Sequence, residues 1–262
     1  MLFLLSPAKT LDYDSAVPAD IARQSSAPLF TAQGAQLIAV LKKKTPRQVA
    51  KLMDLSDKLA QLNVQRYGDW REDAAQARHK PALLAFNGDV YDGLDAKTLS
   101  RADIAWANQH LVILSGLYGA LRPLDQLQPY RLEMGTALRT RKGKSLYAFW
   151  GDTVAQHLNE RLADDAAPVV VNLASVEYAR VALRPALKAR VVECVFEDRA
   201  PGDGEYKVIS FFAKKARGML ARWAVQQRVS DVARLVDFDA GGYAYMPARS
   251  TPTRLVFRRV AA

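Results

Sequence analysis

Polar side chains that could move protons or hold a phosphate group follow directly after five apolar runs of the chain. The runs are MLFLL, LLAF, LVIL, VVVNL and KVIS. Ligands of open α/β sheets bind beyond the carboxyl ends of parallel strands, so the five segments converge on one crevice if the runs are such strands. A polar turn between two elements is the alternative interpretation of any single segment. The crevice candidates are Ser6, Lys9, Asp89, Tyr91, Ser115, Tyr118, Arg122, Ser175, Glu177, Tyr178, Lys214, Lys215 and Arg217.

Catalysis in such a crevice would fall to Lys9, Asp89 or Glu177. The two carboxylates could act as an acid–base pair, in which one donates a proton and the other accepts one. Ion pairing with neighbouring cations is their alternative role. The sequence has no GxSxG, GxxxxGK[ST] or HExxH motif and no GxGxxG after a predicted strand. We therefore predict no metal site and no cofactor, and we favour a binding protein over an enzyme.

Phosphate-binding residues are predicted where Lys and Arg residues cluster in the sequence without Asp or Glu among them. Residues 206–230 contain six basic side chains and no Asp or Glu. Three of them stand near the start of a predicted helix, where cations oppose the helix dipole unless an anion is held there. A solvated helix face is the alternative interpretation. The predicted phosphate-binding residues are Lys9, Lys58, Arg122, Arg131, Lys214, Lys215 and Arg217.

The composition favours a polyanionic partner. The 262 residues carry 37 Lys and Arg against 27 Asp and Glu, a net charge of +10. The one cysteine, Cys194, excludes an intrachain disulfide framework. No apolar run approaches the roughly 18 residues of a membrane span, and the apolar N-terminal run is too short for a signal peptide. We therefore expect a cytoplasmic protein that does not bind membranes.

Strands and helices alternate along most of the chain, which predicts an α/β fold with a mixed central sheet and flanking helices. We expect one domain over 1–262, with a helical lobe at 31–70 inside it. Thr45, Ser56 and Ser100 are predicted helix N-caps. A long loop is expected over 122–145. The predicted strands are 1–5, 83–86, 111–114, 169–175, 191–196, 206–210 and 253–259, the last at an edge. The predicted helical segments are 31–67, 101–109, 146–163 and 211–227.

Residues 52–62 resemble a helix-hairpin-helix element, in which backbone amides grip a phosphate without reading bases. Lys58 would face the phosphate. The usual hairpin glycines are absent, and Asp54 and Ser56 stand in their place. A pair of helices packed on the core is the alternative.

Seven segments together resemble the YaaA family of bacterial peroxide-stress proteins. The resemblance implies an α/β arrangement peculiar to the family and a role in surviving hydrogen peroxide by limiting free intracellular iron. It also implies DNA binding through a positively charged cleft and a helix-hairpin-helix-like element, which corresponds to 46–62. The resembling segments are 6–12, 86–94, 115–125, 129–135, 149–152, 172–178 and 209–218.

Two functions follow as hypotheses. The first is a cytosolic DNA-binding protein of the peroxide-stress response, with double-stranded or structured DNA as its partner. The alternative is an enzyme acting on a nucleotide or a nucleic-acid base in the crevice. Direct iron storage has little support, because a basic chain with three scattered histidines offers few iron ligands.

Overall fold

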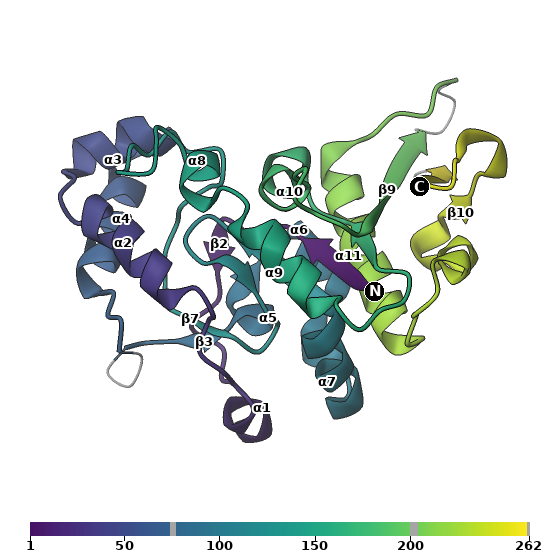
Figure 1. Cartoon of the computed structure of the whole chain (residues 1–262), viewed down its shortest axis with the longest axis horizontal. Helices are drawn as coiled ribbons and strands as arrows, with labels where there is room; N and C mark the ends of the chain where they lie inside the picture. Colours follow the sequence, from purple (N-terminus) through teal and green to yellow (C-terminus); the bar gives the residue numbers. More distant parts are fainter. Residues whose placement is uncertain (74–76, 200–203, 261–262) are drawn as a thin grey trace.

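The computed structural model describes residues 1–73, 77–199 and 204–260, in which helices flank a mixed seven-stranded sheet (Figure 1). The strand order is β10-β11-β9-β8-β1-β5-β6. The strands from β11 to β5 are parallel to their neighbours, and β10 and β6 pair antiparallel at the two edges. The predicted fold class is therefore confirmed. The bounds are β1 (Leu2–Leu5), β5 (Leu111–Ser115), β6 (Gly119–Leu121), β8 (Val169–Asn172), β9 (Arg190–Arg199), β10 (Ala244–Tyr245) and β11 (Arg254–Val260).

The middle of the sheet is buried on both faces. All residues of β1, β5 and β8 are buried, as is typical of parallel strands covered by helices on both sides. Phe3 of β1 pairs with Leu111 of β5 on one side and with Val171 of β8 on the other. The carboxyl ends of these three strands therefore lie at the same edge of the sheet.

Some helices flank this sheet, and others form a separate group at one end of the molecule. Figure 1 shows α2, α3 and α4 together at the end opposite β9 and β10. The α-helices are α1 (Ala19–Arg23), α2 (Thr31–Leu41), α3 (Pro46–Met53), α4 (Asp57–Asp69), α5 (Ala82–Ala85), α6 (Asp89–Leu94), α7 (Arg101–His110), α8 (Leu146–Trp150), α9 (Thr153–Arg161), α10 (Val176–Ala182) and α11 (Ser210–Gln226). The short 3₁₀ turns are η2 (Ala96–Thr98), η3 (Val232–Asp237), η4 (Ala240–Gly242) and η5 (Pro247–Arg249). Two small ladders pair β2 (Thr10–Leu11) with β4 (Phe86–Asn87) and β3 (Lys80–Pro81) with β7 (Gln126–Leu127).

Two of the three predicted N-caps use their side chains. Thr45 and Ser100 each form a capping box, with Gln48 and Asp103 as the reciprocal partners. Ser56 occupies the N-cap position of α4, but its side chain makes no capping hydrogen bond.

Two predicted strands are wrong. Residues 83–86 lie mostly in α5, and only Phe86 belongs to the two-residue β4. A short apolar run does not distinguish a buried helix from a buried strand, because both bury every residue. Residues 206–210 form no strand and make only an isolated bridge, from Lys207 to Asp198. Val208 is 54% exposed there, so this apolar run has no core to pack against.

Two other predicted elements are displaced or divided. The strand expected at an edge is β11, which lies between β9 and β10. Its Arg258 and Arg259 form ion pairs with Glu197 and Asp198 of β9. The helix expected over 146–163 divides into α8 and α9 at Gly151, whose φ of 50° interrupts the helix.

The α3–α4 hairpin corresponds to the predicted helix-hairpin-helix element, but its geometry does not establish that motif. Asp54 takes the left-handed backbone conformation at the end of α3, with φ 51°. The inner face packs on the core through Val49, Ala60 and Tyr67, as a pair of helices with no ligand also would. Lys58 is exposed on α4.

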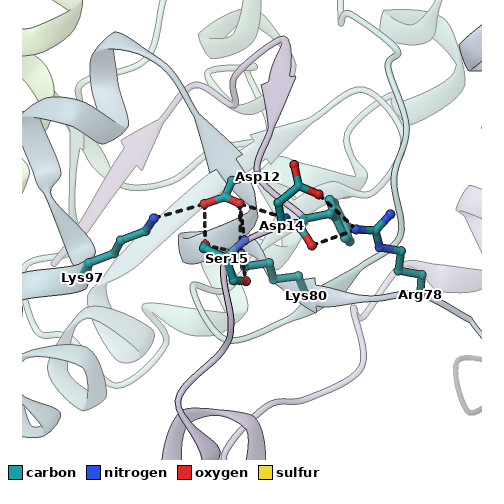
Figure 2. A network of polar contacts seen from close by, with 7 residues as sticks. Asp12, Asp14, Ser15, Arg78, Lys80 and Lys97 are labelled. Carbon is teal, nitrogen blue, oxygen red and sulfur yellow. Dashed lines mark hydrogen bonds and ion pairs between the residues drawn. The ribbon is translucent and has the colours of Figure 1, made fainter.

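A polar network fixes the chain segment after β2 (Figure 2). Asp12 accepts hydrogen bonds from the backbone and hydroxyl of Ser15 and from Lys97 Nζ. Lys80, whose side chain is 3% exposed, donates to the carbonyl and hydroxyl oxygens of Ser15 at 2.8 and 2.9 Å. Arg78 donates to the carbonyl of Tyr13. These contacts tie the segment to β3 and η2.

Candidate functional site

A cavity of about 400 Å³ opens where β1 and β8 end. Its wall is formed by the loop after β1, the start of α10, α6 and α11, together with Thr10, Asn87 and Glu133. It contains carboxylates, cations and hydroxyl groups together, and we call it the β1–β8 cavity. Its lining residues are Ser6, Pro7, Ala8, Lys9, Thr10, Asn87, Gly88, Asp89, Val90, Tyr91, Glu133, Ser175, Glu177, Tyr178, Lys214 and Arg217.

Hydrogen bonds between distant segments fix one wall of the cavity. The backbone N–H of Ser175 donates to Ser6 Oγ at 2.9 Å, which ties the exit of β1 to the start of α10. The hydroxyl of Tyr91 donates to the Ser6 carbonyl at 3.1 Å. Ser175 Oγ accepts from the N–H of Tyr178 and caps α10. The serines therefore shape the cavity, and their oxygen atoms are already engaged.

Two glycines bring α6 and α11 into direct backbone contact. A Cβ atom on Gly218 of α11 would lie 1.8 Å from the Val90 carbonyl oxygen. A Cβ on Gly93 of α6 would lie 2.1 Å from the Lys215 carbonyl oxygen. Only glycine permits such an approach, since any side chain would separate the helices. This crossing places Lys214 Nζ 3.7 Å from Asp89 Oδ2 at the cavity wall.

The three cations that line the cavity differ in their partners. Lys9 Nζ lies 3.1 Å from Glu133 Oε2, and the Lys9 side chain is 65% exposed. Lys214 is about half exposed and contacts Asp89 at the longer distance given above. Arg217 has a buried Nε that has no hydrogen-bond partner. Burial lowers the pKa of Arg217, and the negative charge of Glu193 acts in the opposite direction. Arg217 is thus the cation whose hydrogen-bonding capacity is least satisfied.

The carboxylates also differ. Glu133 accepts from Nε and Nη2 of Arg131 at 3.1 and 2.8 Å, in addition to its contact with Lys9. Glu177 Oε1 accepts from the backbone N–H of Gly135 at 2.8 Å. Within the described part of the chain, no Lys or Arg nitrogen lies within ion-pair distance of Glu177. Glu177 therefore keeps an oxygen for a ligand.

The two tyrosines of the cavity are neutral hydrogen-bonding groups. Burial raises the pKa of Tyr91 well above its usual value. Burial also raises the pKa of Tyr178, and the negative groups Glu177 and Glu133 add to this effect. A site with cations, carboxylates and neutral hydroxyls can hold an anion and exchange a proton with the rest of the same ligand.

The structure brings most of the predicted crevice residues to this cavity but not Ser115 and Tyr118. Ser115 is fully buried and hydrogen-bonds the hydroxyl of Tyr130 at 2.6 Å. Tyr118 is 1% exposed and accepts from Trp70 Nε1 at 3.0 Å. The chain turns back into β6 at Gly119, so this strand end is covered by core. Ser115 and Tyr118 therefore do not line the cavity.

Four predicted phosphate-binding residues also lie outside the cavity lining. Arg122 forms an ion pair with Asp125. Arg131 donates a hydrogen bond to Glu133, and Glu133 lines the cavity. Lys58 and Lys215 are exposed on α4 and α11.

Asn87 and Glu133 line the cavity but were not among the predicted site residues. Asn87 precedes the Gly88–Asp89 turn, and its position at the end of an apolar run was a usable signal. Glu133 lies in the long loop 122–145, and its spacing two residues after Arg131 was the only local signal. No cluster of three or more His, Cys, Asp or Glu side chains that could hold a metal occurs in residues 1–73, 77–199 and 204–260. No helix in the same ranges is long and apolar enough to cross a membrane.

Comparison with known proteins finds one family and many close relatives. The family described as "Peroxide stress protein YaaA" matches residues 1–249. A UPF0246 protein of Leptothrix cholodnii is 62% identical over 259 residues, which cover 99% of this chain and 98% of the relative. A UPF0246 protein of Polaromonas naphthalenivorans is 58% identical over the same length. A UPF0246 protein of Bordetella pertussis is 57% identical over all 262 residues of both chains.

Proposed function

Because the chain belongs to the peroxide stress protein YaaA family, we propose that it acts in the peroxide-stress response by binding DNA in the cytoplasm. The β1–β8 cavity and the adjoining face of α11 would receive the DNA backbone. The net charge of +10 supports a polyanionic partner of this kind.

Arg217 is the observation that carries this proposal. A guanidinium group presents Nε and Nη donors in a fork that matches two phosphate oxygens. The Nε of Arg217 is buried without an acceptor, and the residue lines the cavity together with Lys9 and Lys214. Among the described residues, Arg161 is the other arginine with a buried nitrogen lacking a partner, and it does not line this cavity. A phosphate in the cavity would offer this guanidinium group acceptors that the fold does not supply.

Contacts of this type hold the backbone and do not read bases. Neutralising phosphates with Lys and Arg releases condensed cations from DNA, so the affinity falls steeply with salt. Released cations would include ferrous ions bound to the same phosphates. We propose that this displacement is how the protein limits iron-driven damage to DNA.

The test compares two charge-matched double variants. Lys214→Ala with Arg217→Ala should weaken binding to a labelled duplex and shallow the slope of log K against log salt by about two units, roughly one per phosphate contact. Lys188→Ala with Arg190→Ala removes the same charge from exposed positions just before and at the start of β9, outside the cavity lining, and should leave the slope near that of the wild type. Equal effects of the two variants would refute the assignment, because they would show a response to net charge alone.

Glu177 supports a second candidate function, an enzyme acting on a nucleotide or a nucleic-acid base. Its carboxylate lines a cavity of nucleoside size, and no Lys or Arg of the described chain pairs with it. Such a carboxylate could act as a general base or acid. Glu177→Gln keeps the shape and the acceptor for Gly135 N–H, and should abolish turnover of a nucleotide while leaving DNA affinity unchanged. Displacement of DNA by one free mononucleotide would favour this function, and failure of every mononucleotide to compete would count against it.

A further inference from the structure

An exposed aromatic side chain lies one helical turn from the β1–β8 cavity. Phe211 is 56% exposed, and it is the only aromatic residue in the described ranges that is exposed to this degree. Val208, just before α11, is 54% exposed, and Val176 of α10 is 82% exposed. Val176 stands between Ser175 and Glu177, which both line the cavity. Apolar side chains are thus exposed on two of the elements that form the cavity wall.

The cations of α11 share a face with Phe211. Lys214 and Lys215 follow Phe211 by three and four residues, the spacing of neighbours on one side of an α-helix. Lys214 lines the cavity, and both lysines are exposed. No acidic residue occurs between positions 206 and 230. A ligand on this face would therefore meet an aromatic ring with two positive charges beside it.

The ring of Phe211 is supported from within the fold. Its centroid lies 5.7 Å from that of Phe212 in an edge-to-face arrangement. Phe212 in turn lies under the guanidinium of Arg259, 4.9 Å from the ring centroid. Phe211 is thus held against a packed neighbour while more than half of its surface stays in water.

We propose that Phe211 is a stacking residue for an unpaired base of DNA whose adjacent phosphates contact Lys214 and Lys215. Single-stranded binding sites combine a basic surface with aromatic rings, because every base offers a flat apolar face. In a continuous duplex the base faces are already stacked on one another. The protein therefore prefers single-stranded or gapped DNA to intact duplex at this face. This inference rests on the proposed DNA binding and specifies the form of DNA that the site takes.

The test uses probes that separate bases from phosphates. Fluorescence anisotropy would measure the affinity for oligothymidylate, for a strand of the same length built from abasic residues, and for a duplex of the same length. Phe211→Ala should weaken binding to oligothymidylate about tenfold, within the range for one stacked base. Its affinity for the abasic strand should change less than about twofold, because that strand offers phosphates without base faces.

Conservative variants distinguish stacking from simple apolar contact. Phe211→Trp should retain the affinity for oligothymidylate, and Phe211→Leu should be as weak as Phe211→Ala, because leucine has no π face. Val236→Ala truncates an exposed valine of η3 and should change none of the three affinities. Equal affinity of wild type and Phe211→Ala for oligothymidylate, or an equal loss on the abasic strand, would overturn the inference.

A variant without the two lysines distinguishes a wrong stacking role of Phe211 from a wrong proposal of DNA binding. Lys214→Ala with Lys215→Ala should weaken binding to all three probes, since it removes phosphate contacts. If it does so while Phe211→Ala has no effect, DNA binding stands and the stacking role is wrong. If none of the probes responds to the charge variant, the proposed DNA contact itself is wrong. Weakened binding of Phe211→Ala to anionic phospholipid vesicles, with unchanged DNA affinity, would assign the face to a membrane and also overturn the inference.

Discussion

The polar network of Asp12, Ser15, Lys80 and Lys97, here called the Asp12 network, and the β1–β8 cavity contain the same kinds of side chain. They differ in how many of their charged groups have a partner of opposite charge or a hydrogen-bond partner within the chain. In the network, Lys80 is 3% exposed, and its Nζ meets three oxygen atoms of Ser15 and Asp12 (Figure 2). In the cavity, Lys9 is 65% exposed and Lys214 is 52% exposed, and Arg217 has a buried Nε without a partner.

The difference supports the proposal that the cavity, and not the network, binds a ligand. Burying a charge is unfavourable unless hydrogen bonds and an opposite charge replace water. In the network, oxygen atoms of Ser15 and Asp12 replace that water around the buried Lys80, so its charge holds the segment after β2 in place. The cavity replaces it only in part, so a bound anion would improve the contacts of Arg217.

The largest expected effect is the loss of Lys80. Lys80→Met keeps most of the side-chain volume but leaves the carbonyl of Ser15 and one oxygen of Asp12 without their buried partner. We expect unfolding free energy to fall by about 3 kcal/mol, as for other broken buried pairs. Urea unfolding would measure it, with Lys97→Met as the control. Lys97 contacts the same carboxylate but is 64% exposed, so its loss should be about 0.5 kcal/mol. Similar losses of unfolding free energy in Lys80→Met and Lys97→Met would show that the burial of Lys80 does not make its contacts stronger.

A smaller effect is expected from the titration of Asp12. Its hydrogen bonds from Ser15, followed by Lys97 and Lys80, hold the pKa of Asp12 well below its usual value, and burial opposes them only in part. Because the folded pKa is the lower one, the stabilisation is present above the unfolded pKa of about 3.9 and is lost as the pH falls below it. Asp12→Asn should be less stable than wild type at pH 6 by about 1–2 kcal/mol. This difference in unfolding free energy between wild type and variant should become smaller as the pH is lowered toward 3. A difference in unfolding free energy that does not change with pH would show that titration of Asp12 is not its cause.

The smallest expected effect on stability belongs to Arg217. Arg217→Met removes the guanidinium with the unsatisfied Nε and retains an apolar stem, so unfolding free energy should change by less than about 1 kcal/mol in either direction. The same variant should lose DNA affinity. Urea unfolding and anisotropy on the same preparation would check both. A stability loss as large as that of Lys80→Met would remove the distinction between the two regions and make Arg217 structural.

Three central strands and two helix caps of this protein were predictable from local patterns. Continuous apolar runs identified β1, β5 and β8, because a parallel strand between two helical layers buries every side chain. Thr45 and Ser100 were identified as caps by residue type and by their position before a helix. The segments 83–86 and 206–210 were wrongly predicted as strands, since four or five residues carry too short a pattern to separate helix, strand and exposed loop.

Part of the candidate site was predictable for a topological reason. If β1 and β8 are parallel neighbours, Ser6 and Ser175 must lie at one edge of the sheet, and both line the cavity. The same logic placed Ser115 and Tyr118 there, but the return of the chain into β6 buried them. Glu133 was missed because it reaches the cavity from a loop, where no periodic pattern fixes direction.

The sequence by itself determined the fold class, the basic charge and most of the strand ends that meet, because these depend on composition and on neighbours along the chain. Only the tertiary structure decided which charges are matched. Lys80 meets Ser15 across 65 residues, and Gly93 and Gly218 must touch opposing backbones before Asp89 can face Lys214. Arg217 lies beside the cavity with one donor open for the same reason. Electrostatic matching is a sum over all groups in space, so side chains of the same type become a structural network in one place and a candidate binding site in another.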